Sequence, residues 1–554
     1  MNKKRLVIVG GVAAGASCAA RARRLDESAR ITLIERGPDV SFANCGLPYF
    51  IGGEIKQRDA LAVQTPQTLK AMLALDVRTS TEAIAIDRTG KRVQVRDLAA
   101  GTTEWLPYDK LLLAPGALPI RPNLPGIDDP RLFTLRSLQD MDRIKAAAAT
   151  AQRIAVIGAG FIGLEMAEQF VRLGKQVTLV ELQNQVLPPL DGPMTLLMED
   201  ELRRHGIDLI LGDGIAGFVG ETTLTCRLNS GRIVAADLVV LSIGVRPDTS
   251  LALDAGLELG QRGHIRVNPF MQTSDPDIYA AGDAIEVYDF VNGEVTAVPL
   301  GGPANRQGRL AADHIFHPEH TKPYTGALGT AIVRAFDVAA GLTGWSEKRL
   351  RAASRAYRTV TVNDNHHAGY YPGAKPLLLK LIWEPESGRV IGAQVTGFLG
   401  VDKRIDVIAT AITGGLSIDD LAQLELAYAP PFGAAKDIVN LAAFTACNAR
   451  DGLVTPIDSI PIDPLVQVVD TRPAPLVQAH PLTQVSSINI PLSALRQRLG
   501  ELDRNRPVVT VCALGKTAYF AARILAQNGF QVSTLTGGIR AHFDPRTPAK
   551  LPTP

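Results

Sequence analysis

Short apolar runs that lead into glycine-rich turns recur along this 554-residue chain. Residues 6–9 (Leu-Val-Ile-Val) form such a run, a turn of small residues follows at 10–15, and the Ala-rich stretch 16–24 has the composition of a helix. A second apolar run, 31–34, ends at Glu35. Continuous β-branched runs of this length are typical of strands that are buried on both faces of a parallel sheet. The pattern therefore predicts a strand–turn–helix–strand unit that ends in an acidic residue.

The same pattern occurs a second time. Arg153 precedes the apolar run 154–157, residues 158–163 are Gly-Ala-Gly-Phe-Ile-Gly, a helical stretch runs to Leu173, and the run 177–180 ends at Glu181. Small residues in such a turn let a pyrophosphate approach the backbone at a helix N-terminus, and the acid accepts a hydrogen bond from a ribose hydroxyl. One glycine-rich turn alone could be only a tight connection. Two complete units favour two nucleotide sites.

The remainder of the chain also alternates strand and helix patterns. Mixed strands and helices follow from about residue 327 and include the apolar runs 377–383 and 390–395. The proline-spaced residues 451–464 predict a linker, and beyond it apolar runs alternate with helical stretches such as 518–528. This alternation predicts an α/β protein, and a chain of this length is expected to form roughly three to four domains.

Composition excludes several classes of function. The formal charge of +2 is too small to indicate binding to nucleic acid or to an anionic membrane, and no apolar run reaches the roughly 18 residues of a spanning helix. Glycines interrupt the apolar start of the chain, which favours a buried strand over a signal peptide and predicts a cytoplasmic location. The five cysteines are scattered and form no Cys-x-x-Cys pair, so neither a disulfide framework nor a metal site is predicted. Three of them are expected to be small buried residues, namely Cys18, Cys226 and Cys447.

Two further segments point to a family. Residues 108–116 predict a buried strand that ends in a small-residue turn, and residues 278–284 predict a strand that delivers Asp283 to the start of a helix. Together with the two nucleotide units, they resemble the pyridine nucleotide–disulfide oxidoreductase family. The resemblance implies two Rossmann-like domains, with FAD bound by the first and NAD(P)H by the second. It also implies that Asp283 hydrogen-bonds the ribityl chain of the flavin.

The resemblance assigns cofactor-binding residues to both units. The FAD-binding residues would be Gly10, Gly11, Ala14, Gly15, Glu35, Arg36, Ala114, Pro115, Gly116, Gly282 and Asp283. The NAD(P)H-binding residues would be Gly158, Gly160, Phe161, Ile162, Gly163, Glu181 and Gly244. No arginine follows Glu181, whose carboxylate would repel the 2′-phosphate of NADPH, so NADH is favoured unless a nearby loop arginine overrides this preference.

A lone cysteine is the candidate redox centre. Cys45 lies between Asn44 and a Gly-Leu-Pro turn, and Phe50 stands where many members of the family have a second cysteine. A lone thiol cannot close an intramolecular disulfide, so it must alternate between the thiolate and a mixed disulfide, a persulfide or a sulfenic acid. Residues 44–49 resemble the branch of coenzyme A-disulfide reductases and NADH-dependent persulfide reductases. NADH peroxidases and oxidases also have a single cysteine.

The coenzyme A branch implies a binding site for that ligand. Its residues would be Ser17, Arg21, Arg24, Ser41, Asn44 and Lys436. Arginines suit coenzyme A because guanidinium groups bind phosphates in a bidentate manner. The alternative for either arginine is an ordinary solvated charge on the first helix.

Two tyrosines complete the site that the resemblance implies. In the coenzyme A branch, the tyrosine that matches Tyr428 reaches the redox cysteine across a homodimer, and Tyr370 matches a second tyrosine with a similar role. A phenol can hydrogen-bond a thiolate and protonate a leaving sulfur, which is general-acid catalysis. Simple packing beside prolines is the alternative, and Tyr371 adjoins Tyr370.

Residues 465–554 resemble an α/β rhodanese domain. A strand ends at Cys512, and a Gly-containing loop leads from there into the helical stretch. Backbone N–H groups and the helix dipole stabilise a thiolate at such a turn, so Cys512 is expected to be a catalytic thiol that carries a persulfide. Thr517 stands where many rhodaneses have an arginine, with Lys516 as the adjacent cation. This departure, and Ala-His-Pro-Leu at 479–482 in place of Gly-His-Ile, disfavour thiosulfate as the sulfur donor.

The predicted organisation has six segments. They are 1–150 (FAD-binding domain, first part), 151–275 (NAD(P)H-binding domain), 276–326 (FAD-binding domain, second part), 327–450 (α+β dimerisation domain), 451–464 (linker) and 465–554 (rhodanese-like domain).

The predicted function is that of an FAD-dependent NAD(P)H oxidoreductase. Through Cys45 it would reduce coenzyme A persulfide, polysulfide or coenzyme A disulfide, and an appended sulfurtransferase domain would handle sulfane sulfur. The alternative is a NADH peroxidase or oxidase in which Cys45 cycles through a sulfenic acid and the rhodanese-like domain is a sulfur carrier or a docking module. Either enzyme would be a homodimer that acts on small molecules, without a nucleic-acid or membrane partner.

Overall fold

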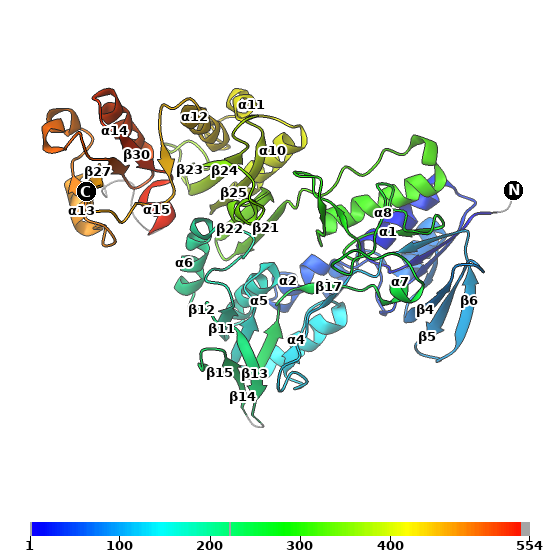
Figure 1. The fold of residues 1–554 in the computed structure, drawn as a ribbon. Coiled ribbons are helices and arrows are strands. Elements are labelled where there is room, and N and C mark those ends of the chain that lie inside the picture. Colours follow the sequence, from blue (N-terminus) through cyan, green and yellow to red (C-terminus); the bar gives the residue numbers. More distant parts are fainter. Residues whose placement is uncertain (1–2, 221–222, 544–554) are drawn as a thin grey trace. The chain divides into compact units, whose positions relative to one another are not determined.

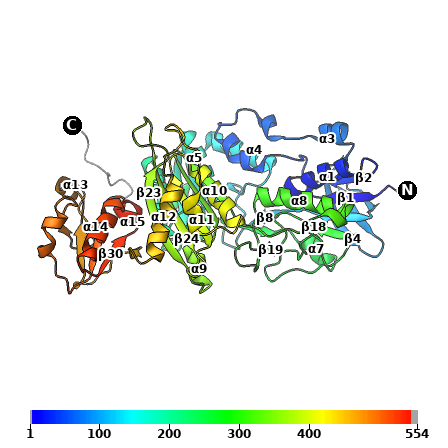
Figure 2. The same cartoon turned by 90° about the horizontal axis from the view of Figure 1, so that it is seen from above.

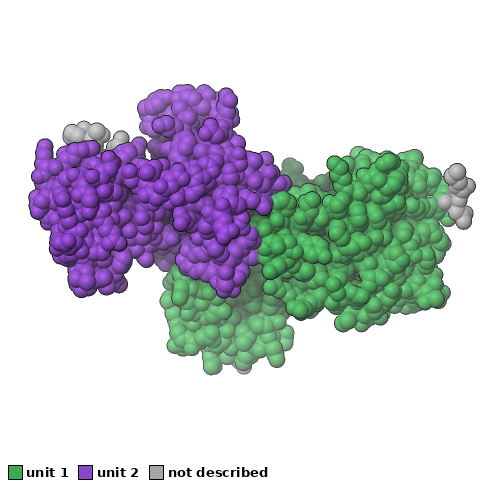
Figure 3. All heavy atoms as spheres, turned by 45° about the horizontal axis from the view of Figure 1, so that its top comes forward, with its two compact units in different colours: residues 1–184, 206–329 green, residues 185–205, 330–554 purple. Residues whose placement is uncertain are grey.

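The computed structural model describes residues 3–220 and 223–543, drawn in Figures 1 and 2. The chain divides into unit 1, residues 1–184 with 206–329, and unit 2, residues 185–205 with 330–554 (Figure 3). Residues 544–554, at the end of the predicted rhodanese-like domain, lie outside the described residues, as do residues 1–2 and 221–222. None of the described helices combines the length and apolar character that crossing a membrane requires.

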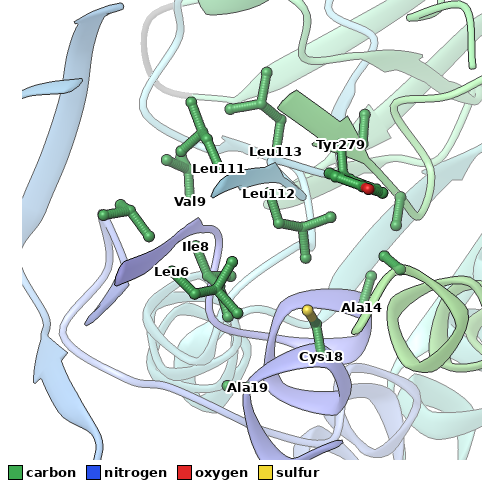
Figure 4. Packing of buried hydrophobic residues seen from close by; sticks show 14 of the residues in the cluster. Leu6, Ile8, Val9, Ala14, Cys18, Ala19, Leu111, Leu112, Leu113 and Tyr279 are labelled. Carbon is green, nitrogen blue, oxygen red and sulfur yellow. The ribbon is translucent and has the colours of Figure 1, made fainter. Parts of the chain in front are cut away.

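A parallel sheet forms the first nucleotide-binding fold of unit 1. Its strands, in spatial order, are β18 (Ile278–Ala280), β7 (Lys110–Leu113), β1 (Arg5–Val9), β2 (Arg30–Ile34) and β3 (Asp76–Arg78). The strands predicted at 6–9 and 31–34 are thereby confirmed. Leu6, Ile8 and Cys18 lie in one fully buried core (Figure 4), which confirms that Cys18 is a small buried residue. A separate antiparallel sheet follows β3 in the chain and comprises β4 (Thr81–Asp87), β5 (Arg92–Asp97) and β6 (Thr103–Pro107).

Two helices pack side by side next to this sheet (Figure 2). They are α1 (Ala13–Leu25), which follows the first glycine-rich turn, and α8 (Gly301–Phe316). Gly308 makes their close approach possible, because a Cβ atom at this position would lie 2.0 Å from the carbonyl oxygen of Ala14. The missing side chain at Gly308 therefore sets the separation of the two helices.

A second parallel sheet carries the second nucleotide unit. Its strands, in spatial order, are β12 (Asp208–Leu211), β11 (Gln176–Glu181), β10 (Arg153–Ile157), β16 (Leu238–Leu241) and β9 (Leu132–Phe133). The accompanying elements are the helices α4 (Leu138–Thr150) and α5 (Phe161–Arg172) and the antiparallel strands β13 (Ile215–Val219), β14 (Leu224–Leu228) and β15 (Ile233–Ala236). Cys226 is buried in this core, as predicted.

Residues 185–205, from within the predicted NAD(P)H-binding domain, belong to unit 2. They include α6 (Leu196–Arg204). The physical reason is a buried polar network: Asp191 accepts a hydrogen bond from Gln394 at 2.7 Å and lies 3.2 Å from the ammonium of Lys380. All three side chains are buried, and breaking a buried charge pair is costly, so this segment is fixed to unit 2.

An antiparallel sheet forms the middle of unit 2. Its strands, in spatial order, are β21 (Ala331–Ala335), β22 (Val338–Gly344), β25 (Val390–Gly397), β24 (Pro376–Trp383) and β23 (Arg358–Asn365). The helices of this region are α9 (Glu347–Ala352), α10 (Val401–Thr413), α11 (Ile418–Gln423) and α12 (Ile438–Arg450). The apolar runs 377–383 and 390–395 are β24 and β25, as predicted. Cys447, expected to be buried, is partly exposed on α12, where its thiol approaches Asp419 at 3.7 Å.

A parallel sheet forms the C-terminal part of unit 2. Its strands, in spatial order, are β26 (Pro456–Ile457), β30 (Val532–Leu535), β29 (Val508–Val511), β27 (Gln467–Asp470) and β28 (Ile488–Asn489). Its helices are α13 (Ala474–Ala479), α14 (Lys516–Gln527) and α15 (Gly538–His542). The segment 451–464, expected to be a linker, thus contributes an edge strand to this sheet.

The packing of α1 on α8 predicts a specific sensitivity at Gly308. Gly308→Ala places a methyl group against the Ala14 carbonyl and should destabilise the protein by about 1–3 kcal/mol, the usual range for overpacking. Gly302→Ala is the matched control, because a Cβ at that position of the same helix meets nothing within 4 Å. Thermal unfolding should show a lower midpoint for Gly308→Ala only. Equal midpoints for the two variants would contradict this account of the packing.

Candidate active site

The first glycine-rich turn forms a cradle of backbone at the carboxyl ends of the parallel strands. Gly10 follows β1 with φ +98°, and a Cβ there would lie 2.0 Å from the carbonyl oxygen of Ala114, which follows β7. A Cβ at Gly15 would lie 1.8 Å from the Gly10 oxygen, so neither position tolerates a side chain. In open α/β sheets, ligands bind outside the carboxyl ends of the strands. Such a cradle, at the start of α1, fits the pyrophosphate of a dinucleotide.

Two carboxylates lie at the same edge of the sheet. Glu35, after β2, accepts hydrogen bonds from the backbone N–H groups of Gly11 and Gly37, both at 2.8 Å. Asp283 follows β18, and its carboxylate accepts no hydrogen bond from the described residues. Burial raises the pKa of Asp283, and Arg136 opposes this rise. A ligand hydroxyl can donate a hydrogen bond to this carboxylate, so its position fits the ribityl chain of FAD.

The structure brings together the other residues predicted to bind FAD, and adds one. Gly282 has φ +84° and packs against Ala14, with 3.4 Å between its added Cβ and the Cβ of Ala14. Arg36 is paired with Asp248 at 3.3 Å rather than free. Arg136, which no motif identifies, donates a hydrogen bond to the carbonyl of Pro115 at 2.8 Å and lies beside Gly116. Arg136 is therefore a further candidate for anchoring the cofactor.

The second glycine-rich turn repeats the construction. Gly158 has φ +101°, and its added Cβ would lie 2.5 Å from the carbonyl oxygen of Ser242. Glu181 accepts hydrogen bonds from the backbone of Ala159 at 2.8 Å and of Gln183 at 2.9 Å. The other predicted NAD(P)H residues of the turn lie at the start of α5, namely Gly160, Phe161, Ile162 and Gly163, and Gly244 (φ +116°) follows β16. The glycine-rich turn and the Glu181 carboxylate thus fit the pyrophosphate and the ribose of a second dinucleotide.

Cys45 lies next to the first nucleotide site. It belongs to the short 3-10 turn η1 (Asn44–Gly46), which leads into α2 (Leu47–Ile51), and it is an exposed free thiol. Phe50, in the place of a second cysteine, is buried. Desolvation of its sulfur, followed by the carboxylates of Glu165 and Asp283, raises the pKa of Cys45. Both effects favour the thiol over the thiolate.

Glu165 is a site residue that the motifs did not identify. It lies on α5, directly after the second glycine-rich turn, and accepts a hydrogen bond from the Tyr49 hydroxyl at 3.1 Å. Tyr49 is four residues beyond Cys45. The pair thus links the cysteine segment to the helix of the second nucleotide site. No sequence signal could reveal this contact, because the two residues are far apart in the chain.

The residues predicted to bind coenzyme A have different surroundings. Ser17 donates a hydrogen bond to Asn305 of α8 at 2.5 Å, and Arg21 is paired with Asp313 at 2.5 Å. Arg24 is exposed, and its side chain has no partner among the described residues. In unit 1, therefore, Arg24 is the predicted arginine whose charge is free for a phosphate. Asn305 is another residue that sequence motifs missed.

The other predicted coenzyme A residues are all accessible or partly so. Ser41 has a left-handed backbone (φ +49°) and donates its N–H to the Gly11 carbonyl at 2.8 Å, which ties the cysteine segment to the first turn. Asn44 is exposed beside Cys45. Lys436 is exposed and belongs to unit 2.

The two predicted tyrosines form a pair in unit 2. The hydroxyls of Tyr370 and Tyr428 are 3.0 Å apart, and both side chains are exposed, by 76% and 47%. Their mutual hydrogen bond raises the pKa of Tyr370, so its hydroxyl keeps its proton to a higher pH. Tyr371 instead packs edge-on against His367. Tyr370 is thus distinguished from its neighbour by the contact of its hydroxyl with that of Tyr428.

A buried ion pair holds the loops that carry these tyrosines. Arg404 contacts Asp437 at 2.6 Å and donates a second hydrogen bond to the His366 carbonyl at 2.7 Å. The backbone N–H of Ala368 donates to the Gly433 carbonyl at 2.8 Å. Loops 366–371 and 428–437 are thus fixed to each other by several bonds.

Cys512 is buried in a loop at the end of β29. Its Sγ accepts hydrogen bonds from the backbone N–H groups of Gly515 at 3.1 Å and Ala518 at 3.3 Å, at the start of α14. Donors aimed at one sulfur stabilise an anion there. Thr517, in place of the arginine of many rhodaneses, hydrogen-bonds Thr471 at 3.2 Å and supplies no charge, while Lys516 is exposed.

Comparison with known proteins finds three family matches along the chain. The sequence matches the pyridine nucleotide-disulphide oxidoreductase family over residues 4–302, the dimerisation domain of that family over 330–438, and the rhodanese-like domain over 457–542.

Individual proteins are similar over most of the chain. Coenzyme A disulfide reductase from Staphylococcus haemolyticus is 35% identical over 446 residues, which are 80% of this chain and 99% of that protein. The structure of reduced CoADR-RHD from Bacillus anthracis is 44% identical with a TM-score of 0.95 and covers 99% of this chain and 100% of that chain. The NAD-dependent persulfide reductase from A. fulgidus is 38% identical with a TM-score of 0.92 and covers 97% and 100%.

The surroundings of Cys45 predict how its reactivity changes with charge. Glu165→Gln removes a carboxylate that raises the pKa of Cys45, so the thiolate fraction at neutral pH should increase. Alkylation of Cys45 by iodoacetamide in the reduced holoenzyme should become several-fold faster at pH 7, with the rate profile displaced to lower pH. Glu54→Gln is the control, because that carboxylate does not act on the pKa of Cys45. An unchanged profile in Glu165→Gln would refute the electrostatic assignment.

Proposed function

Because the chain belongs to the pyridine nucleotide-disulphide oxidoreductase family, we propose that it is a flavoenzyme that uses NADH to reduce coenzyme A persulfide, polysulfide or coenzyme A disulfide. The names of its relatives in S. haemolyticus and A. fulgidus support these acceptors. A cytoplasmic homodimer is part of the proposal, supported by the match to the dimerisation domain.

Residues of unit 1 bind the two cofactors in this proposal. The cradle of Gly10 and Gly15, with Glu35 and Asp283, would hold FAD, and the turn at Gly158 would hold NADH. With both cofactors bound, the site would have the two-electron reducing chemistry that reduction of sulfur at Cys45 requires. The carboxylate of Glu181 disfavours a 2′-phosphate on the nicotinamide cofactor, which is the reason for preferring NADH.

Cys45 is the proposed nucleophile toward sulfur. Its thiolate attacks the sulfur attached to coenzyme A in a coenzyme A persulfide, which forms a Cys45–coenzyme A mixed disulfide and releases hydrosulfide. Two electrons and one proton then return the mixed disulfide to the Cys45 thiolate and free coenzyme A thiol. With coenzyme A disulfide, the first step instead releases a coenzyme A thiolate. Arg24, exposed and without a partner among the described residues, is suited to bind a phosphate of the ligand.

The Tyr370–Tyr428 pair is the proposed general acid. In a homodimer, the exposed hydroxyls of one subunit would serve Cys45 of the other, together with Lys436. The hydrogen bond between the two hydroxyls keeps a proton available near the leaving sulfur.

Cys512 is the proposed sulfur-transfer thiol. Its thiolate would take the outer sulfur of a small persulfide, forming the Cys512 persulfide and releasing the thiolate of the donor. The N–H groups of Gly515 and Ala518 would stabilise the anionic sulfur. Residue 517 is a threonine, so the loop lacks a guanidinium group that could bind thiosulfate through two hydrogen bonds. This favours persulfides as sulfur donors.

The single observation that carries the proposal is the setting of Cys45. It is an exposed free thiol beside the first nucleotide cradle, and the residue in the place of a partner cysteine is a buried phenylalanine. Cys45→Ser should bind flavin normally and lose at least about a hundredfold of NADH turnover with coenzyme A persulfide and with coenzyme A disulfide. Cys447→Ser, a partly exposed cysteine outside the site, is the control. Full turnover by Cys45→Ser would exclude this function.

The two thiols should be separable by substrate. Cys512→Ser should keep wild-type turnover with coenzyme A disulfide, because that reaction needs only Cys45. Cys45→Ser should still form a persulfide on Cys512 when it is treated with glutathione persulfide, as read by mass spectrometry of the peptide. Equal loss of coenzyme A disulfide reduction in Cys512→Ser would contradict the division of roles.

A further inference from the structure

Backbone of residues 538–540 contacts one side of the cysteine loop in the rhodanese-like region. The N–H of Ile539 donates to the carbonyl of Cys512 at 2.9 Å, and that of Arg540 donates to Ala513 at 3.1 Å. Gly538 (φ +65°) is in close contact with loop 512–515. A Cβ atom added to it would be 2.4 Å from the N atom of Gly515 and 2.6 Å from the Cys512 carbonyl oxygen. Because the Gly515 N–H is a donor to the Cys512 sulfur, Gly538 forms a wall behind that donor.

This wall is anchored to a different domain. The carbonyl of Gly537 accepts a hydrogen bond from the Asn363 amide at 2.5 Å. The hydroxyl of Thr536 accepts from the N–H of Thr361 at 2.7 Å and donates to the carbonyl of Thr361 at 3.0 Å. Asn363 and Thr361 belong to β23, the edge strand of the antiparallel sheet in the middle of unit 2.

The contact occupies the open edge of that strand. Thr536 satisfies both backbone groups of Thr361, as a neighbouring strand would, and both residues are buried. A Cβ at Gly537 would lie 2.7 Å from the methyl group of Thr361, so the two segments are in direct van der Waals contact. A series of hydrogen bonds and covalent bonds therefore runs from β23 through 536–540 to the carbonyls of Cys512 and Ala513, and Gly538 packs against the donor Gly515.

We propose that Asn363 and Thr536 are positioning residues of the Cys512 site, so that the cradle around this thiol is complete only while the rhodanese-like region is docked on β23. The proposal rests on the proposed sulfur-transfer role of Cys512. The Cys512 site would thus include β23 of the dimerisation domain as well as the rhodanese-like region.

The molecule offers a matched control for simple docking. Asn448 of α12 also joins the two regions through its side-chain amide, which donates to the Tyr519 hydroxyl at 3.2 Å. Like Asn363, Asn448 is partly buried, but the Tyr519 side chain that it contacts makes no bond to the Cys512 sulfur or to segment 536–540. If docking alone mattered, loss of either amide would have the same effect.

The test measures the accessibility of Cys512 in the full-length, flavin-loaded protein. Iodoacetamide is the probe, and mass spectrometry follows alkylation of the Cys512 peptide, with the Cys45 peptide as internal reference. Asn363→Ala and Thr536→Val should alkylate Cys512 about fivefold faster than wild type, the factor expected when one hydrogen bond that holds the wall closed is lost. Asn448→Ala should react at the wild-type rate. Thr536→Ser, which keeps the hydroxyl, should also react at the wild-type rate.

Three outcomes would overturn the proposal. They are wild-type rates in both Asn363→Ala and Thr536→Val, an equal acceleration in Asn448→Ala, and a Thr536→Ser variant that behaves like Thr536→Val. Failure of the proposed sulfur-transfer role would instead be seen as a Cys512 peptide that gains no persulfide from glutathione persulfide in the wild-type protein. It would leave the alkylation rates of Cys512 unchanged, so the two failures are distinguishable.

Discussion

The direct contact of backbone with backbone at the carboxyl ends of parallel strands is the constraint on which both nucleotide sites depend. Gly10 meets the Ala114 carbonyl and Gly158 meets the Ser242 carbonyl at distances that leave no room for a Cβ atom. The helix that follows each turn consequently starts against the sheet, with its first N–H groups facing the crevice. Glu35 and Glu181 each accept a hydrogen bond from one backbone N–H of their own turn, so the acid and the turn are fixed together. One local solution, used twice, provides the two cofactor sites.

Two thiols of the chain have opposite surroundings, which suit them to different chemistry. Cys45 is accessible, and desolvation of its sulfur together with nearby carboxylates raises its pKa, so formation of its thiolate depends on what binds beside it. Cys512 is buried, and two N–H donors point at its sulfur. The surroundings of Cys45 suit a thiol that reacts only when cofactor and substrate are bound beside it. Those of Cys512 suit a thiol that holds an anionic sulfur away from solvent.

Much of this arrangement is local in sequence and was therefore predictable. The glycine-rich turns, the strands around them and the loop of Cys512 each lie in one short segment. Glu165, Arg136 and Asn363 could not be predicted, because each acts on a residue that is distant in the chain and none belongs to a motif. The choice between Tyr370 and Tyr371 likewise depends on a contact, since only Tyr370 reaches the Tyr428 hydroxyl. Pairing with β30 made β26 a strand where its prolines indicated a linker.

The central claim is that electrons leave the protein through Cys45. Mass spectrometry of the intact flavoprotein, mixed with coenzyme A disulfide in the absence of NADH and then digested, tests it most directly. The account predicts one coenzyme A attached to the Cys45 peptide of reduced enzyme, and its release when NADH is added. No adduct at this position, or an adduct that NADH does not remove, would contradict it.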